Sequence, residues 1–175
     1  AITSLVLAML LFLSFRIVPP GHRGVYTWLG SVEPRIADEG FTLLVPGFES
    51  LHLVDVRVTP HDFKQIEAAS KELLAVTMTG KLNYRIDPTR VNELYQKVGL
   101  DFPNKVLDPA LSDFLKEVAP NYSINEMLPK RDEIRRKTVE KLAANLERYG
   151  IIISDIYIAD ISFPQEFNNA IERKQ

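Results

Sequence analysis

The sequence predicts an α+β fold that follows an apolar N-terminal helix, and three observations lead to this prediction. The first fifteen residues contain no charged side chain and no proline. Several short segments up to Ile86 then alternate apolar and polar residues, as half-buried β-strands do. After Asp87 the apolar residues recur at intervals of three and four, which is the period of an amphipathic helix.

Composition limits the functions that the chain can perform. It has 175 residues, of which 46% are hydrophobic and 25% charged, and this suits one or two compact domains. A net charge of −2 offers no basic excess for nucleic-acid phosphates. The absence of cysteine excludes disulfides and cysteine–zinc sites. The chain begins inside an apolar run and ends inside an apparent helix, so we expect it to be a segment of a longer protein.

Residues 1–18 have three interpretations. Fifteen uncharged residues rise about 22 Å as a helix, less than the roughly 30 Å hydrocarbon core of a bilayer. We therefore favour a transmembrane anchor whose first residues precede Ala1. A signal peptide would need a cleavage site that is absent, and a buried core helix would need a polar face. The expected anchor residues are Leu5, Val6, Leu7, Leu10, Leu11, Phe12, Leu13, Phe15 and Ile17.

Residues 19–86 are expected to form a β-rich lobe. Pro19, Pro20 and Gly21 end the apolar helix and turn the chain. The clearest strand is 76–86, with its even-numbered residues on the buried face. Apolar residues of the first strands are expected in the core, or else at a membrane interface because the anchor holds them close to it: Trp28, Phe41, Leu43, Leu44 and Phe48. The interface candidates are Arg16, Tyr26, Trp28 and Phe48.

Residues 87–163 are expected to form an α/β lobe. One helix is predicted to start with Asp87 as its cap and Pro88 at its first position. Two more helices are predicted over 108–118 and over 130–149, the last ended by Gly150. Ser123 and Glu126 have the spacing of a capping box. Both faces of the segment 151–163 are apolar, which predicts a strand covered on both sides. Residues 164–175 begin another helix, with Phe167, Ala170 and Ile171 on one side.

Nothing in the sequence predicts an enzyme. Phosphate-binding loops, dinucleotide fingerprints, HExxH and GxSxG are all missing. His22, His52 and His61 lack metal-ligand spacing, so we expect structural or solvated roles for them. We therefore predict no catalytic residue, no metal and no cofactor.

The charged helix at 130–149 has two interpretations. Its polar side chains form either a solvated face with i,i+4 ion pairs or a contact surface for a second subunit or acidic lipid. The candidates for a subunit interface, including two from the last segment, are Arg131, Glu133, Arg135, Arg136, Glu140, Phe167 and Ile171.

Several motifs in this order resemble those of one known family. They include VPPGHRGVYTWLGSV at 18–32, VTMTGKLNYRIDP at 76–88 and YQKVGLDFPNKVLDPAL at 95–111. The chain resembles the SPFH (band 7) superfamily along nearly its whole length, and within it the prohibitins. This resemblance implies a membrane anchor at 1–18, SPFH lobes at 19–86 and 87–163, and a long coiled-coil helix beginning at 164–175.

The resemblance also implies a function that the residues alone do not. Family members are single-pass membrane scaffolds that assemble into large rings or cages, organise a membrane microdomain, and enclose or regulate an FtsH-type AAA protease. The implied partners are copies of the same chain, membrane lipids and such a protease. We favour a bacterial plasma or internal membrane over the mitochondrial inner membrane. A stomatin-like regulator of a channel or transporter is the alternative.

Overall fold

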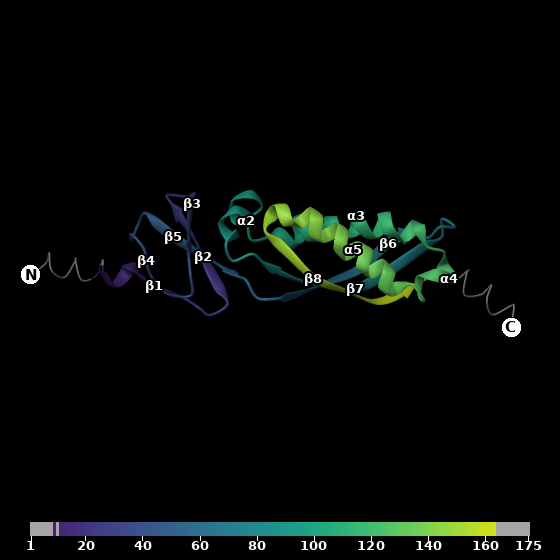
Figure 1. Ribbon diagram of the computed structural model, residues 1–175. Helices are drawn as coiled ribbons and strands as arrows, with labels where there is room; N and C mark the ends of the chain where they lie inside the picture. The colour runs from purple at the N-terminus through teal and green to yellow at the C-terminus, as the bar shows by residue number, and fades with distance from the viewer. Residues whose placement is uncertain (1–8, 10, 164–175) are drawn as a thin grey trace, which may run out of the picture. The chain divides into compact units, whose positions relative to one another are not determined.

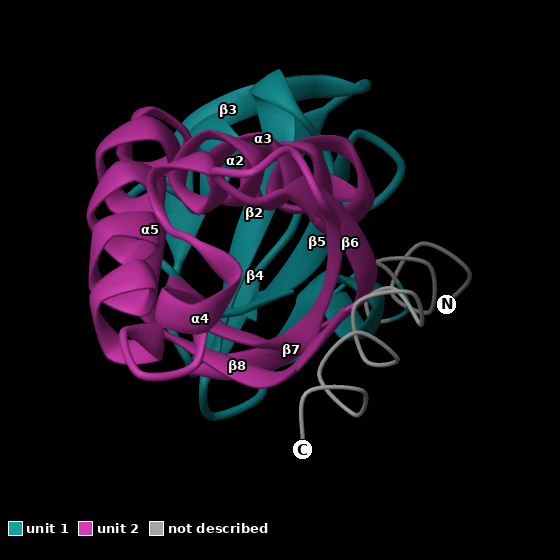
Figure 2. Cartoon of the chain, turned by 90° about the vertical axis from the view of Figure 1, so that its right-hand side faces the viewer, with its two compact units in different colours: residues 1–57, 86–100 teal, residues 58–85, 101–175 magenta. Residues whose placement is uncertain are grey.

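The chain forms two compact units, each built from two separate stretches of sequence (Figure 2). A computed structural model describes residue 9 and residues 11–163. Unit 1 comprises Ala1–Arg57 and Ile86–Leu100, and unit 2 comprises Val58–Arg85 and Asp101–Gln175.

Unit 1 is a small β structure with one helix. Its elements are β1 (Phe15–Val18), β2 (His22–Trp28), β3 (Ser31–Ala37), β4 (Gly40–Leu43), β5 (Glu49–Asp55) and α2 (Val91–Lys97). Strand β2 is the centre of an antiparallel sheet with β3 and β5, while β1 and β4 pair as a separate two-stranded ribbon. The core of this unit contains Val18, Tyr26, Ala37 and Leu44, with Leu51 packed against it.

Unit 2 packs helices against a three-stranded sheet of order β6-β7-β8 (Figure 1). Its elements are β6 (Thr59–Ala69), β7 (Ala75–Ile86), the π-helix η1 (Pro103–Leu107), α3 (Asp108–Val118), the 3-10 helix η2 (Ala119–Asn121), α4 (Ile124–Met127), α5 (Arg131–Leu146), the 3-10 helix η3 (Glu147–Tyr149) and β8 (Ile151–Ser162). Helix α3 contacts β6 and α5, and α5 contacts β8.

Local patterns in unit 2 confirm several predictions. In β7 the even-numbered residues are buried, with Val76, Met78 and Leu82 fully so. Gly80 belongs to this face because a Cβ there would overlap the carbonyl oxygen of Tyr157 and lie 2.6 Å from Cζ of Phe63. The capping box begins α4, and Gly150 ends η3 with a φ of 73°.

The predicted helix over residues 1–18 is wrong in its last part. Met9 and residues 11–14 are helical, but Phe15 and Ile17 lie in strand β1. The backbone here bonds to β4 instead of continuing the helix, and the Leu44 N–H donates to the Ser14 carbonyl over 2.8 Å. Leu5, Val6, Leu7 and Leu10 lie outside the described residues. Within the described residues, no helix has both the length and the apolar character needed to cross a membrane.

The two units are interleaved in sequence, unlike the consecutive lobes expected at 19–86 and 87–163. The β6–β7 hairpin belongs to unit 2 because β7 pairs with β8 and β6 packs against α3. Helix α2 belongs to unit 1 because it packs against β2 and β3. These are contacts between residues far apart in sequence, which periodicity cannot reveal.

Two local predictions were also wrong. Asp87 does not cap a helix: its carboxylate accepts hydrogen bonds from the backbone and hydroxyl of Thr89, and α2 begins later, at Val91. Strand β8 is not covered on both faces, since Tyr157 is 61% exposed. The strand instead buries five isoleucines, Ile151, Ile153, Ile156, Ile158 and Ile161. Two of the four intervals between them are three residues instead of two, so the apolar residues do not follow a strict alternation.

Candidate functional site

The β1–β4 ribbon of unit 1 presents large apolar side chains to solvent. Phe15 is paired with Leu43, and Ile17 with Phe41. These four side chains share one face because residues two apart in a strand point the same way. Their exposed fractions are 46% for Phe15, 77% for Ile17, 63% for Phe41 and 52% for Leu43. The Phe15 and Phe41 rings lie 5.2 Å apart. We call these four side chains the ribbon face.

The opposite side of the ribbon faces the interior of unit 1 at Val18 and Thr42, whereas Arg16 on that side is exposed. Val18 is 1% exposed and belongs to the core cluster. The hydroxyl of Thr42, next to Phe41, is hydrogen-bonded to the hydroxyl of Tyr26. A ribbon on a soluble protein normally turns its largest apolar side chains inward. This ribbon instead turns four of them outward, so it is built to contact something apolar.

Arg16 connects the ribbon to the helical residues before it. Its guanidinium donates hydrogen bonds to the carbonyl oxygens of Phe15, over 3.0 Å, and Leu13, over 3.4 Å. Leu13 lies in the last helical turn before β1, where carbonyl groups have no partner within the helix. Phe12, in that turn, is 81% exposed. The positive charge of Arg16 is therefore held beside apolar side chains.

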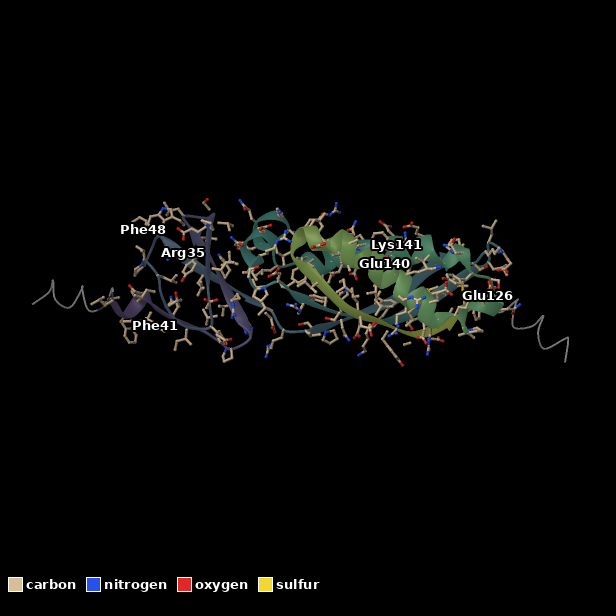
Figure 3. All side chains as sticks on the ribbon, in the orientation of Figure 1. Arg35, Phe41, Phe48, Glu126, Glu140 and Lys141 are labelled. Atoms are coloured by element: carbon tan, nitrogen blue, oxygen red, sulfur yellow. The ribbon has the colours of Figure 1, made fainter. Side chains whose placement is uncertain are left out.

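A second group of exposed apolar side chains lies at the β2–β3 turn. The rings of Trp28 and Phe48 are stacked with centroids 5.5 Å apart. Leu29 is 71% exposed at a φ of 47°, a conformation that L-residues rarely adopt, and its N–H donates to the Phe48 carbonyl over 2.8 Å. Val45 is 44% exposed. We call Trp28, Leu29, Val45 and Phe48 the aromatic corner; Figure 3 shows Phe41 and Phe48 at the surface of unit 1.

A polar network holds the aromatic corner in place. The Arg35 guanidinium binds the carboxylates of Glu33 and Glu49, and it lies 3.9 Å from the centre of the Tyr26 ring. The second oxygen of Glu49 accepts the Val45 N–H over 2.7 Å. Hydrogen bonding to Glu33 raises the pKa of Arg35 further above its ordinary value. The loop that carries Phe48 is thus fixed by charge-assisted hydrogen bonds.

The structure changes the set of predicted interface residues. Tyr26 is excluded, because it is 5% exposed and lies in the core of unit 1. Trp28 and Phe48 are exposed, and so are Phe41 and Leu43, which were expected either in the core or at a membrane interface. Leu44 alone of that apolar group is buried. The sequence signal for the ribbon face was weak: Arg16 separates residues 15 and 17 and Thr42 separates residues 41 and 43, but the next residues, Val18 and Leu44, are apolar, and the pairing of β1 with β4 could not be inferred.

The subunit-interface candidates on α5 divide into two groups. Glu133 binds Lys137 and accepts the Tyr122 hydroxyl, both over 3.0 Å, and Arg135 binds Asp155 of β8 over 3.1 Å. These two residues therefore stabilise unit 2 itself. The side chains of Arg131, Arg136 and Glu140 are exposed. Phe167 and Ile171 lie outside the described residues.

The three histidines have structural partners. His22 lies 3.3 Å from the Pro20 carbonyl, and His52 stacks on Tyr95 at 4.8 Å. His61 is bonded to the Asp108 carboxylate over 2.6 Å. Among the described residues no group of three His, Asp or Glu side chains is arranged to hold a metal ion.

Comparison with known proteins identifies the family. The model of the SPFH domain / Band 7 family matches residues 16–175. The chain belongs to this family. The match covers both units, and its start coincides with the ribbon that carries the exposed apolar face. Family membership also supports the expectation that the chain is not an enzyme.

The chain is similar to several prohibitins. It is 30% identical to Prohibitin-1 of Schizosaccharomyces pombe, 28% to Prohibitin-2 of Saccharomyces cerevisiae and 29% to mitochondrial prohibitin complex protein 1 of Caenorhabditis elegans. Each alignment covers 90% of this chain and, in the same order, 56%, 51% and 58% of the relative. The SPFH chain therefore spans little more than half the length of these curated relatives.

Proposed function

We propose that this SPFH chain is part of a non-enzymatic membrane scaffold whose unit 1 rests against a lipid bilayer. The observation that carries the proposal is the ribbon face, which exposes four large apolar side chains directly after an apolar N-terminal segment. Patches of this kind mark contact surfaces for membranes or proteins. The similarity to prohibitins, one of them named as part of a mitochondrial complex, supports a membrane assembly.

The chemistry of the exposed groups favours a bilayer surface. Trp28 belongs to a residue type that is enriched at the boundary between lipid headgroups and acyl chains. Arg16 has a charged head that would stay among headgroup phosphates while the apolar ribbon face enters below it. Burying a side chain such as Ile17 or Phe41 contributes roughly 1.5–3 kcal/mol. Together these groups would hold unit 1 against the membrane that its anchor enters.

We further propose that the scaffold is a large homo-oligomeric ring or cage. An anchor confines each copy to a plane and raises its local concentration, so weak contacts suffice. Head-to-tail contacts then close into a ring where the rotation permits. Arg131, Arg136 and Glu140 are the exposed candidates on α5, and a helix from 164–175 would continue the wall by coiled-coil packing. Organisation of a microdomain around an FtsH-type AAA protease stays a prediction, as does a bacterial membrane.

Trp28 provides a direct test of membrane contact because it is the single tryptophan of the chain. The full chain is reconstituted in vesicles whose lipids carry bromine on the upper part of the acyl chains. We expect its fluorescence to be quenched by these lipids and shielded from aqueous iodide. If iodide quenches Trp28 as strongly with vesicles as without them, the aromatic corner does not meet the bilayer and the proposal fails.

Assembly is tested by electron microscopy of the full-length protein extracted in mild detergent. Closed rings or cages are expected. Monomers or small oligomers at working concentration would contradict the scaffold and favour the alternative, a stomatin-like regulator of a channel or transporter.

A further inference from the structure

Unit 1 carries few basic side chains, although it holds the two apolar surfaces described above. Residues 1–57 contain no lysine. The whole unit has six basic and seven acidic side chains, which is a net charge of −1 with histidine neutral. Proteins that bind acidic lipid through charge present clusters of lysine and arginine beside the membrane. The composition of unit 1 does not provide such a cluster.

Two exposed carboxylates lie beside the ribbon face. Asp38 and Glu39 directly precede Gly40, the first residue of β4, and their side chains are 86% and 55% exposed. They share one cation, since the Arg23 guanidinium lies 3.2 Å from the Asp38 carboxylate and 3.7 Å from the Glu39 carboxylate. The four residues of β4 span about 10 Å, which is about one screening length at 0.1 M salt. This group therefore places a net negative charge within electrostatic reach of the ribbon face.

The aromatic corner has the same arrangement of charges. The Arg35 guanidinium is shared by the carboxylates of Glu33 and Glu49. Glu49 is paired with Trp28 across β2 and β5, so this group adjoins the aromatic rings. At both apolar surfaces, one cation thus faces two anions.

Most other basic residues of unit 1 are also bound to carboxylates. Arg57 binds Asp55 over 2.7 Å, and hydrogen bonding to Arg57 lowers the pKa of Asp55 to about 2, so this pair stays ionised at neutral pH. Glu93 binds both Arg90, over 3.0 Å, and Lys97, over 3.2 Å. These cations are therefore already neutralised by the protein.

Arg16 is the one basic side chain in the described part of unit 1 that has no carboxylate partner. A zwitterionic headgroup carries an anionic phosphate, which suits Arg16, and a cationic amine, which suits Asp38 and Glu39. An anionic lipid such as phosphatidylserine adds a further negative charge, which these two carboxylates would repel. The charges of unit 1 are therefore complementary to a zwitterionic surface.

We propose that the ribbon face and the aromatic corner bind a zwitterionic bilayer surface by inserting their apolar side chains, with no requirement for anionic lipid. This lipid preference rests on the membrane role proposed above and names the class of lipid that the surface contacts. The attraction comes from burial of apolar area, and dissolved salt screens charges without removing that attraction. The contact should therefore persist at high salt.

The test uses the fluorescence of Trp28 in the full chain, reconstituted in vesicles that contain a fixed amount of brominated phosphatidylcholine. The remaining lipid is phosphatidylcholine alone or includes phosphatidylserine. We expect the brominated lipid to quench Trp28 in both sets of vesicles. Replacing about one third of the lipid by phosphatidylserine, or adding salt until the screening length falls from about 30 to about 3 Å, should change the quenching by less than about 1.5-fold.

This measurement distinguishes the lipid class from the membrane role itself. Quenching that occurs only with phosphatidylserine and is lost at high salt would overturn the zwitterionic preference and leave the membrane role standing. If Trp28 is not quenched in any of the vesicles, both the preference and the membrane role are wrong.

Asp38→Lys tests whether the carboxylates beside the ribbon set this preference. The substitution changes the charge of the Arg23 group from −1 to +1, so phosphatidylserine should now increase the quenching of Trp28 by more than about 1.5-fold at low salt, and high salt should remove the increase. The matched control is Asp132→Lys in unit 2, because Asp132 is 87% exposed and lies 3.8 Å from Arg135. The control should behave like the native chain. An equal response of the two variants, or no response to Asp38→Lys, would contradict the proposal.

Discussion

At the scale of single residues, the stability of unit 1 depends on one arginine, Arg35. Arg35 neutralises Glu49, whose side chain is 5% exposed, and also covers the Tyr26 ring. A buried carboxylate is tolerated when its charge is paired and its oxygens are hydrogen-bonded. The second Glu49 oxygen bonds to the Val45 backbone, so the same pair sets the position of the aromatic corner.

Arg35→Leu should therefore destabilise unit 1 by about 2–3 kcal/mol, because it leaves the Glu49 charge buried without its partner. Urea unfolding followed by Trp28 fluorescence reports on this unit. The control is Asp38→Asn, which breaks the bond of Arg23 to a carboxylate that is 86% exposed and should cost less than about 1 kcal/mol. Equal effects of the two changes would show that Glu49 does not need Arg35.

Glu126 makes unit 2 sensitive to acid. Its bond to Lys130, together with hydrogen bonds from the Ser123 backbone and hydroxyl, lowers its pKa from 4.5 to about 2. A lowered pKa in the folded state means that the contribution to stability is complete above about pH 4.5 and is lost as the pH falls towards 2. Glu126→Gln keeps the capping geometry and removes the charge.

The native chain should thus be more stable than Glu126→Gln at pH 7, and the difference should disappear near pH 2. Thermal unfolding followed by circular dichroism across this range measures both proteins. A difference that stays constant with pH would mean that the Glu126 charge contributes nothing to the fold.

At the scale of elements, the ribbon face predicts which positions contact a membrane. Residues on it should meet lipid, while an exposed residue of unit 2 should not. An environment-sensitive fluorophore attached to Ile17→Cys or Phe41→Cys should shift its emission to the blue when vesicles are added to the full chain. Tyr157→Cys, at a position that is 61% exposed in β8, is the control and should not respond. A matching response at all three positions would argue against a specific membrane face.

How far the sequence predicts an element depends on the range of its contacts. Strand β7, the α4 capping box and the stop at Gly150 were predicted because each pattern repeats or closes within a few residues. The ribbon was missed because Ile17 pairs with Phe41, 24 residues away. Without that pairing, the apolar residues of β1 extend the preceding helix, and those of β4 look like core. The sequence therefore predicted only part of the candidate site: it indicated apolar and aromatic residues near a membrane, but not that four of them form one exposed face.

At the scale of the whole molecule, the order of the units along the chain decides which fragments can fold. Residues 58–163 contain every described element of unit 2, with 86–100 as a connection between β7 and η1. Residues 87–163, the lobe expected from the sequence, lack β6 and β7. In that fragment β8 has no neighbouring strand, and α3 lacks the strand β6 on which it packs.

The fragment 58–163 should therefore unfold cooperatively on heating and show well-dispersed amide resonances, whereas 87–163 should do neither. The physical reason is that the missing hairpin contributes the fully buried Val76, Met78 and Leu82, as well as the strand β6 that α3 contacts. The full chain is the reference for both measurements. Cooperative unfolding of 87–163 alone would mean that helices α3 and α5 with β8 form an independent core, and the SPFH domain would then divide as two consecutive lobes after all.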